Sequence, residues 1–192
     1  MADTNKIKYG LSKCAYAKAT IATDGSAVYT TPVDLPGAVS LSVSPNGDSS
    51  PFYADNIVYF VSVANNGYEG DLELAKVPDS FLKDCLGYIQ DSNGILVEDA
   101  GAAPAHFALL FQFEGDAHAK RHVIYNCVAS RPEVASSTKN ENIEPGTETI
   151  HFTATTVYNN ALTKDVVKAS ATPSESTPYN GWYTTVYQST GM

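Results

Sequence analysis

Side chains suited to catalysis are few in this sequence and form no recognisable pattern. His118 and His122 flank Ala119-Lys120-Arg121, and the two neighbouring cations disfavour a bound metal ion. Glu114 and Asp116 are spaced as a carboxylate pair that would serve a small hydrolase, although exposed hairpin turns commonly carry such residues. The Gly-x-Ser-x-Gly, phosphate-loop, GxGxxG and HExxH motifs are all missing. We therefore expect no enzyme activity, no cofactor and no metal site.

The three cysteines, Cys14, Cys85 and Cys127, are widely spaced, odd in number and without a CxxC pair. This pattern favours buried free thiols in a reducing compartment over a disulfide framework or a zinc site. The polar start, Met-Ala-Asp-Thr-Asn-Lys, predicts no secretory signal. The longest mainly apolar run, from Ile57 to Ala64, is too short to span a bilayer, so we expect no contact with membranes.

The chain is acidic along its whole length. Its 192 residues include 12 Lys and Arg against 21 Asp and Glu, which gives a net charge of −9. Such a chain does not wrap a nucleic-acid backbone by electrostatics alone. Glu69, Asp71 and Glu73 alternate along one predicted strand, and they form either a solvated face or an acidic stripe facing a channel or a partner. The 12 tyrosines suit a carbohydrate-binding face, a sheet core or a subunit interface equally well.

The elements that must position these residues are mainly strands. Asn-Gly occurs four times, at residues 46, 66, 93 and 180, and Asp24-Gly25 adds a fifth pair that predicts a type I′ turn. Between these turns, apolar residues alternate with polar ones. The runs that share a predicted face are Val39, Leu41 and Val43; Phe107, Leu109, Phe111 and Phe113; Val123, Tyr125, Cys127 and Ala129; and Ile150 and Phe152. This period of two predicts an antiparallel β-sandwich or barrel.

One helix is predicted at about residues 78–87. Pro78 suits a first helical turn, and Gly87 suits a helix end. Phe81, Leu82 and Leu86 form its buried face. Long loops are predicted at residues 44–56 and 131–146. The aromatic cluster at residues 182–187 fits either a strand or a short helix.

Seven strings of the sequence, taken in order, resemble a known protein family. They are Pro36–Leu41, Phe52–Asn56, Asn65–Leu74, Val77–Asp84, Phe107–Asp116, Arg121–Cys127 and Ile143–Thr149. Over residues 8–156 the chain resembles the major tail proteins of long-tailed siphovirus bacteriophages, in the phi-thirteen-type branch. The resemblance implies a tail-tube β-sandwich domain over residues 1–156. Residues 157–192 would be a C-terminal extension, either part of the same domain or an inter-subunit arm.

The same resemblance implies a structural protein of the virion tail, assembled in the host cytoplasm. Its copies would form hexameric rings that stack into a hollow tube around a tape-measure protein, and DNA would pass through the lumen during ejection. Tail terminator and baseplate hub proteins are the other implied partners. The loop over residues 44–56 matches in position the long hairpin loop that tail-tube proteins extend to neighbouring subunits. We expect this subunit-contacting loop to include Pro45, Asn46, Gly47, Asp48, Pro51, Phe52 and Tyr53. The candidates for the lumen surface are Asp71, Glu73, Glu114 and Asp116.

A second hypothesis assigns the chain to the same virion but to a different task. In it, the chain is a baseplate or decoration module whose aromatic side chains bind host cell-wall carbohydrate.

Overall fold

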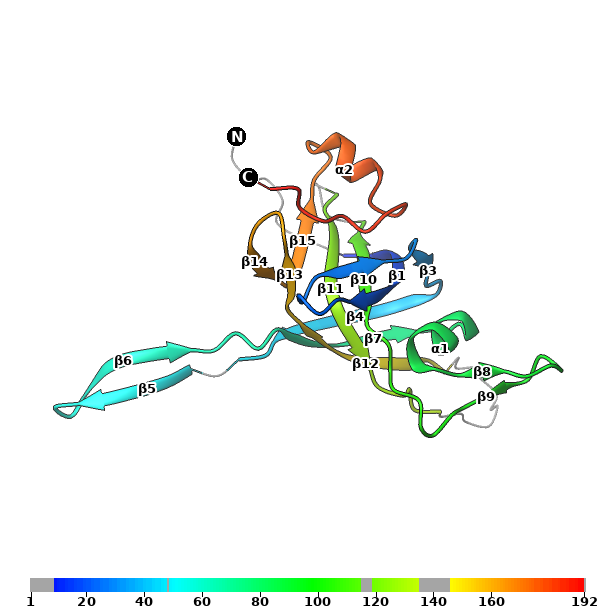
Figure 1. Ribbon diagram of the computed structural model, residues 1–192, viewed down its shortest axis with the longest axis horizontal. Helices are drawn as coiled ribbons and strands as arrows, with labels where there is room; N and C mark the ends of the chain where they lie inside the picture. Colours follow the sequence, from blue (N-terminus) through cyan, green and yellow to red (C-terminus); the bar gives the residue numbers. More distant parts are fainter. Residues whose placement is uncertain (1–8, 48, 115–118, 135–145, 192) are drawn as a thin grey trace.

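The chain folds mainly as antiparallel strands, which confirms the predicted fold class. The computed structural model describes residues 9–47, 49–114, 119–134 and 146–191 (Figure 1). The strands in chain order are β1 (Leu11–Ile21), β2 (Ala27–Tyr29), β3 (Val33–Asp34), β4 (Ala38–Pro45), β5 (Ser49–Ala54), β6 (Ile57–Val63), β7 (Tyr68–Leu74), β8 (Ile89–Gln90), β9 (Leu96–Val97), β10 (Phe107–Phe113), β11 (Arg121–Ala129), β12 (Glu148–Thr155), β13 (Val157–Asn159), β14 (Lys164–Val166) and β15 (Lys168–Ala171). The helices are α1 (Asp79–Leu86) and α2 (Ser176–Asn180).

One large sheet forms the body of the molecule. Its strand order is β2-β1-β10-β11-β12-β7-β4, with β3 also paired to β1 and β15 also paired to β11. Every neighbouring pair whose register is defined is antiparallel. Three further hairpins, β5–β6, β8–β9 and β13–β14, are separate two-stranded sheets.

The large sheet curls around a first core. Its members come from β1, β7, β10, β11, β12, α1 and the segments that precede β4 and α1. They are Cys14, Tyr16, Leu35, Leu72, Leu74, Val77, Phe81, Cys85, Leu86, Phe107, Leu109, Phe111, Ile124, Cys127, Ala129, Ile150, Phe152 and Ala154. Leu41 and Val43 of β4 are half-buried against the same core. Because strands from both ends of the sheet order meet in this core, the sheet folds over itself as a sandwich or open barrel.

A second core lies on the other face of β1, β10 and β11. It contains Ala15, Ala17, Ala27, Ala108, Leu110, Val123, Tyr125, Val157, Ala171, Trp182 and Val186. These central strands are therefore buried on both faces, and residues from 157 onward cover the second face. The prediction that Val123, Tyr125, Cys127 and Ala129 share one face is wrong. The β10–β11 register shifts between Phe107 and Leu109, and Val123 and Cys127 consequently lie in different cores.

The turns differ from the predicted type I′ pairs. A type I′ turn needs positive φ at both central residues, and Asp55 and Asn56 satisfy this between β5 and β6, with φ of 52° and 64°. In Asp24-Gly25 and Asn93-Gly94, which join β1 to β2 and β8 to β9, only the glycine has a positive φ. The remaining pairs do not form hairpin turns: the pairs at 46 and 66 lie beside each other, and the pair at 180 ends α2.

Helix α1 lies where the sequence predicts it. Pro78 precedes the helix, and Gly87 ends it with a left-handed φ of 75° while its N–H donates to the Leu82 carbonyl. The structure also contains a second helix, α2, which the sequence did not predict. Beyond α2, Trp182 and Val186 are buried in the second core. In the described ranges, no helix is long and apolar enough to cross a membrane.

Candidate assembly surfaces

The predicted loop over residues 44–56 is instead the first half of a long hairpin, formed by β5 and β6. The two strands pair antiparallel from Ser49↔Val63 to Ala54↔Ile57. The hairpin extends away from the body of the molecule (Figure 1). Composition alone predicts a loop because Ser, Pro and Asn dominate it, whereas the apolar run that follows supplies a partner strand. The hairpin form agrees with the long hairpin loop that the family resemblance implies.

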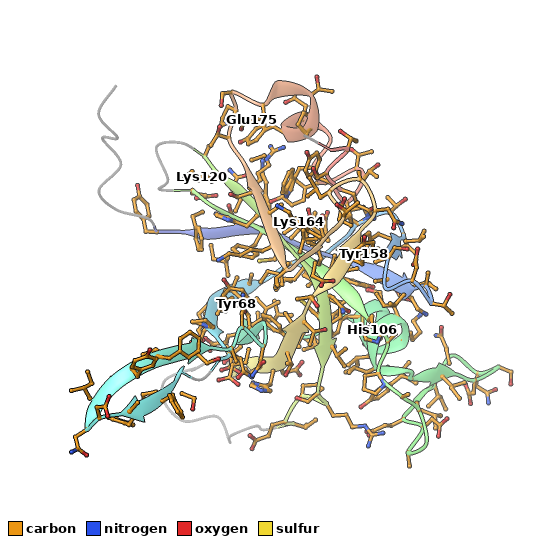
Figure 2. The ribbon with its side chains drawn as sticks, turned by 60° about the vertical axis from the view of Figure 1, so that its left-hand side comes forward. Tyr68, His106, Lys120, Tyr158, Lys164 and Glu175 are labelled. Carbon is orange, nitrogen blue, oxygen red and sulfur yellow. The ribbon has the colours of Figure 1, made fainter. Side chains whose placement is uncertain are left out.

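The hairpin exposes an unusual number of large apolar side chains. Phe52, Tyr53, Ile57, Val58, Tyr59, Phe60 and Val61 are between 47% and 72% exposed. Figure 2 shows the side chains of the hairpin reaching into open space beyond Tyr68, which lies at its base. Apolar clusters of this kind on a soluble protein usually mark an interaction surface. Sequence reasoning singled out the first two of these residues. It noted the apolar run of β6 but gave it no role.

Close backbone contacts hold the base of the hairpin. The Asn46 N–H donates to the Gly67 carbonyl, and the Asn66 N–H donates to the Asn46 carbonyl, at 2.9 and 2.8 Å. A Cβ on Gly47 would lie 2.1 Å from the Ala64 carbonyl oxygen, so only glycine permits this approach. Pro45 is the last residue of β4, Pro51 lies in β5 with the two aromatic residues, and Asp48 is outside the described residues.

A second surface is the outward face of β4, β7 and β12. Glu69, Asp71 and Glu73 of β7 project from it, each between a serine of β4 and a Thr or His of β12. The Ser40 and Thr147 hydroxyls donate to the Glu73 carboxylate at 2.8 and 2.6 Å. These hydrogen bonds hold the pKa of Glu73 below its usual value. None of the three strands contains a Lys or Arg.

His151 also lies on this polar face. Its Nδ1 is 2.7 Å from the Asp71 Oδ1, and both side chains are about half exposed. Sequence reasoning missed His151 because the pairing becomes visible only once β12 is aligned with β7.

Glu114, another proposed lumen residue, does not share this face. Glu114 follows β10, and its N–H donates to the Gly10 carbonyl just before β1. Asp116 lies outside the described residues. The structure therefore brings Asp71 and Glu73 together on one surface and leaves Glu114 at the end of a different hairpin.

Helix α1 packs on the first core through its aromatic residue. The Phe81 ring makes edge contacts with Tyr16 and Phe107, with centroids 5.1 and 5.3 Å apart. Leu86 is buried and Leu82 is half-buried. The Tyr16 hydroxyl, in turn, donates to Asp84 at 2.7 Å, which ties the helix to β1.

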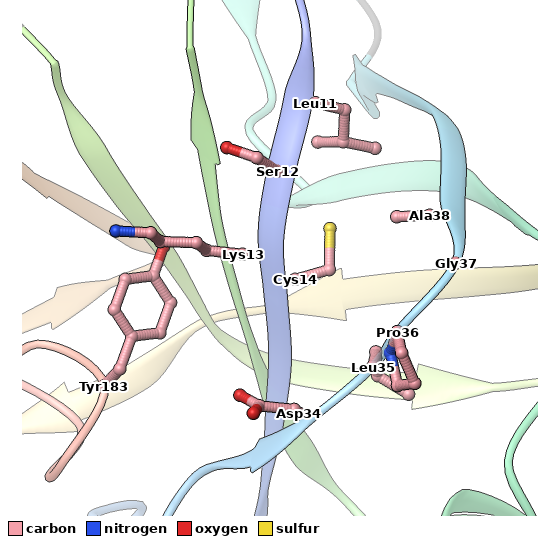
Figure 3. Close-up of a pocket in the computed structure, with 10 residues that line it drawn as sticks. All are labelled: Leu11, Ser12, Lys13, Cys14, Asp34, Leu35, Pro36, Gly37, Ala38 and Tyr183. Carbon is pink, nitrogen blue, oxygen red and sulfur yellow. The ribbon is translucent and has the colours of Figure 1, made fainter.

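An open cleft of about 610 Å³ lies beside β1. Figure 3 shows Leu11 and Cys14 on one side of the strand and Lys13 with Tyr183 on the other. The hydroxyls of Ser12 and Tyr183 are buried, and neither has a hydrogen-bond partner among the described residues. The cleft lies between the start of β1, residues 34–38 at the connection from β3 to β4, and Tyr183.

Groups suited to chemistry are buried or dispersed. Burial raises the pKa of the Cys14 thiol to about 11 and that of Cys85 to about 12, so both are protonated and unreactive at neutral pH. His106 is hydrogen-bonded to the buried Asn126 at 2.7 Å. Within the described ranges, no three His, Cys, Asp or Glu side chains come close enough together to hold a metal ion.

A family model described as phage tail tube protein matches residues 2–177. The matched range includes β1 to β15, and therefore both the hairpin and the acidic face. None of the curated proteins matches the chain significantly. The family is structural, in keeping with the predicted lack of enzyme activity. The chain belongs to the phage tail tube protein family.

Proposed function

We propose that the chain is the repeating subunit of the tail tube, and that six copies close into a ring whose stacking builds a hollow conduit for DNA ejection. The observation that supports this most directly is the β5–β6 hairpin. A two-stranded hairpin is marginally stable alone in water, and this one exposes seven large apolar side chains. A neighbouring subunit that covers the hairpin would remove this surface from water.

The body of the molecule also offers an edge for ring formation. Among the described strands, β4 pairs with β7 alone, so its outer edge carries backbone groups without a strand partner. In a ring this edge would pair with a neighbouring subunit, and the sheets would join into one continuous barrel. Contacts that repeat head to tail in this way generate closed rings or helical tubes.

We assign the face of β4, β7 and β12 to the lumen. Its outward side chains include three carboxylates and hydroxyl groups but no Lys or Arg. Such a surface repels DNA phosphates and lets the duplex slide without binding. With six copies of net charge −9, a ring carries about −54. The tape-measure protein would occupy this lumen before DNA, and tail terminator and baseplate hub proteins would contact the ends of the tube.

The experiment that tests the proposal is negative-stain microscopy of the purified chain and of the Phe52→Ala/Tyr53→Ala variant. We expect hollow tubes with a regular axial repeat from the wild type. The variant should be folded and monomeric, because its substitutions lie on the exposed hairpin and leave both cores intact. Tubes of normal length from the variant would refute the role of the hairpin. A stable wild-type trimer that binds glycan would support the carbohydrate-binding alternative.

A further inference from the structure

A groove of about 230 Å³ opens onto the first core at a gap in the curled sheet. One wall comes from β4 and β7, and the other comes from β10, β11 and β15; among the described strands, the two walls do not pair with each other. Leu41, Val43, Tyr68 and Phe113 line the groove and are half-buried, so they contact both the core and solvent. Small-molecule sites are concave, mainly apolar and often placed at the mouths of β-barrels. The groove has this position and this lining.

Packed aromatic rings form one wall of the groove. The His122 ring stacks on Phe111 with centroids 5.1 Å apart, and Phe113 makes edge contacts with both rings at centroid distances of 5.7 Å. Leu41 and Val43 belong to the opposite wall. A closed cavity of about 150 Å³ accepts one benzene molecule. An open groove of about 230 Å³ is therefore large enough for one aromatic ring with a short polar chain.

Lys168 gives the groove a positive charge. Its Nζ lies 4.6 Å from the centroid of the Tyr68 ring, so the side chain reaches from β15 to β7 on the other wall. Within the described residues, this ammonium forms no ion pair or hydrogen bond. An ammonium carries three N–H donors, and the face of one ring does not satisfy all of them. The residues that line the groove include no Asp or Glu, although acids outnumber bases by 21 to 12 in the whole chain.

We propose that the groove binds a small organic anion with an apolar body, of the arylalkyl carboxylate class. Its carboxylate would contact the Lys168 ammonium, and its ring would pack between Phe113 and the β4 residues Leu41 and Val43. A neutral ligand of the same shape would leave the ammonium without a counter-charge, and a cationic one would be repelled by it. All of these residues belong to one chain, so the inference goes beyond the proposed function and does not depend on ring or tube formation.

Saturation-transfer NMR on the monomer fraction of the full chain tests the charge requirement. The probes are phenylpropionate, phenylpropanol and phenylpropylamine, which share a ring and chain and differ in charge. We expect phenylpropionate to bind about fivefold more tightly than phenylpropanol, because an exposed ion pair contributes up to about 1 kcal/mol. Phenylpropylamine should bind more weakly than the alcohol. The advantage of the carboxylate should shrink as salt rises from about 0.01 M to about 1 M, since salt screens exposed charges.

Two lysine variants locate the charge that the carboxylate meets. Lys168→Gln and Lys164→Gln each remove one exposed ammonium, but only Lys168 lines the groove. We expect Lys168→Gln to weaken phenylpropionate binding about fivefold, to the level of phenylpropanol, and Lys164→Gln to stay within about twofold of wild type. A third variant, Val43→Phe, fills the groove and should abolish binding of both probes. Thermal unfolding followed by circular dichroism verifies that each variant is folded.

Equal binding of phenylpropionate and phenylpropanol would overturn the inference, and so would equal losses from the two lysine variants. Unchanged binding by a folded Val43→Phe variant would place the probe elsewhere on the chain, with the same consequence. If Val43→Phe does not fold, the two lysine variants still decide the question. None of these outcomes bears on tube growth, so the proposed function stands or falls by microscopy alone.

Discussion

Replacing Trp182 by Ala tests whether the C-terminal residues belong to the body of the molecule. The indole is 1% exposed and lies in the second core with Leu110 and Val123. Its Nε1–H donates to the His122 carbonyl at 3.2 Å. Its ring stacks on Tyr187 with centroids 5.6 Å apart. The substitution therefore removes a large buried side chain and one hydrogen bond while leaving the sheet itself unchanged.

The expected loss follows from the burial of this side chain. Replacing a buried aromatic residue by Ala usually costs about 3–5 kcal/mol, because the remaining cavity collapses only partly. For a domain of this size, 1 kcal/mol lowers Tm by about 2–4 °C, so we expect a fall of roughly 6–20 °C. Most of that loss is the transfer and cavity cost, since a neutral hydrogen bond contributes about 1 kcal/mol.

Urea unfolding and calorimetry of the monomer would measure this loss. Val28→Ala is the control, because Val28 is 69% exposed and such surface substitutions change stability by less than about 0.5 kcal/mol. A loss below about 1 kcal/mol for Trp182→Ala would refute the reasoning, because that value is typical of a side chain outside the core. Residues 176–187 would then behave as an arm that can leave the body and dock on another copy.

Two further predictions concern the backbone and the thiols. In urea unfolding, Gly67→Ala should destabilise the chain by at least about 2 kcal/mol more than Gly94→Ala. Both glycines have a left-handed φ, so φ strain is common to the two variants. At Gly67, in addition, the new Cβ would lie 1.9 Å from a backbone oxygen. Equal losses would mean that φ strain alone matters. The free energy of unfolding should fall as pH rises from 9 towards 11, by about 1.4 kcal/mol per pH unit for each of these two thiols. Burial raises the pKa of Cys14 and Cys85 above the ordinary 9.0. The unfolded chain therefore loses these protons at a lower pH than the folded chain does. Below pH 9 the thiols add no pH dependence, and Cys14→Ser should make the alkaline loss shallower; an unchanged slope would contradict the assignment.

The sequence predicts α1 well because the signals that define it are local. Pro78 and Gly87 bound a short segment whose apolar residues recur at helical spacing, and no distant strand is needed to interpret them. The second helix carries no such signals. It begins near Ser176 without a side-chain cap, and burial of Trp182 beyond its end holds the segment in place.

The hairpin and the two cores illustrate what local patterns miss. Residues 49–54 resemble a loop by composition and become a strand only through pairing with β6. The opposite faces of Val123 and Cys127 likewise depend on a register shift against β10, which no single strand encodes. Both features arise from contacts between segments that are read separately in the sequence.

The acidic face bears on two hypotheses that the sequence leaves open. Alternating carboxylates on β7 fit a solvated surface as well as a lumen. A solvated sheet face usually mixes both signs of charge, and opposite charges on neighbouring strands stabilise it. Here the neighbours of β7 are β4 and β12, which place serine, threonine and His151 beside the carboxylates and contain no Lys or Arg. The hydroxyls satisfy Glu73 without neutralising it. The strands of this face thus supply no Lys or Arg to offset its carboxylates, and this is why we propose it as the lumen surface.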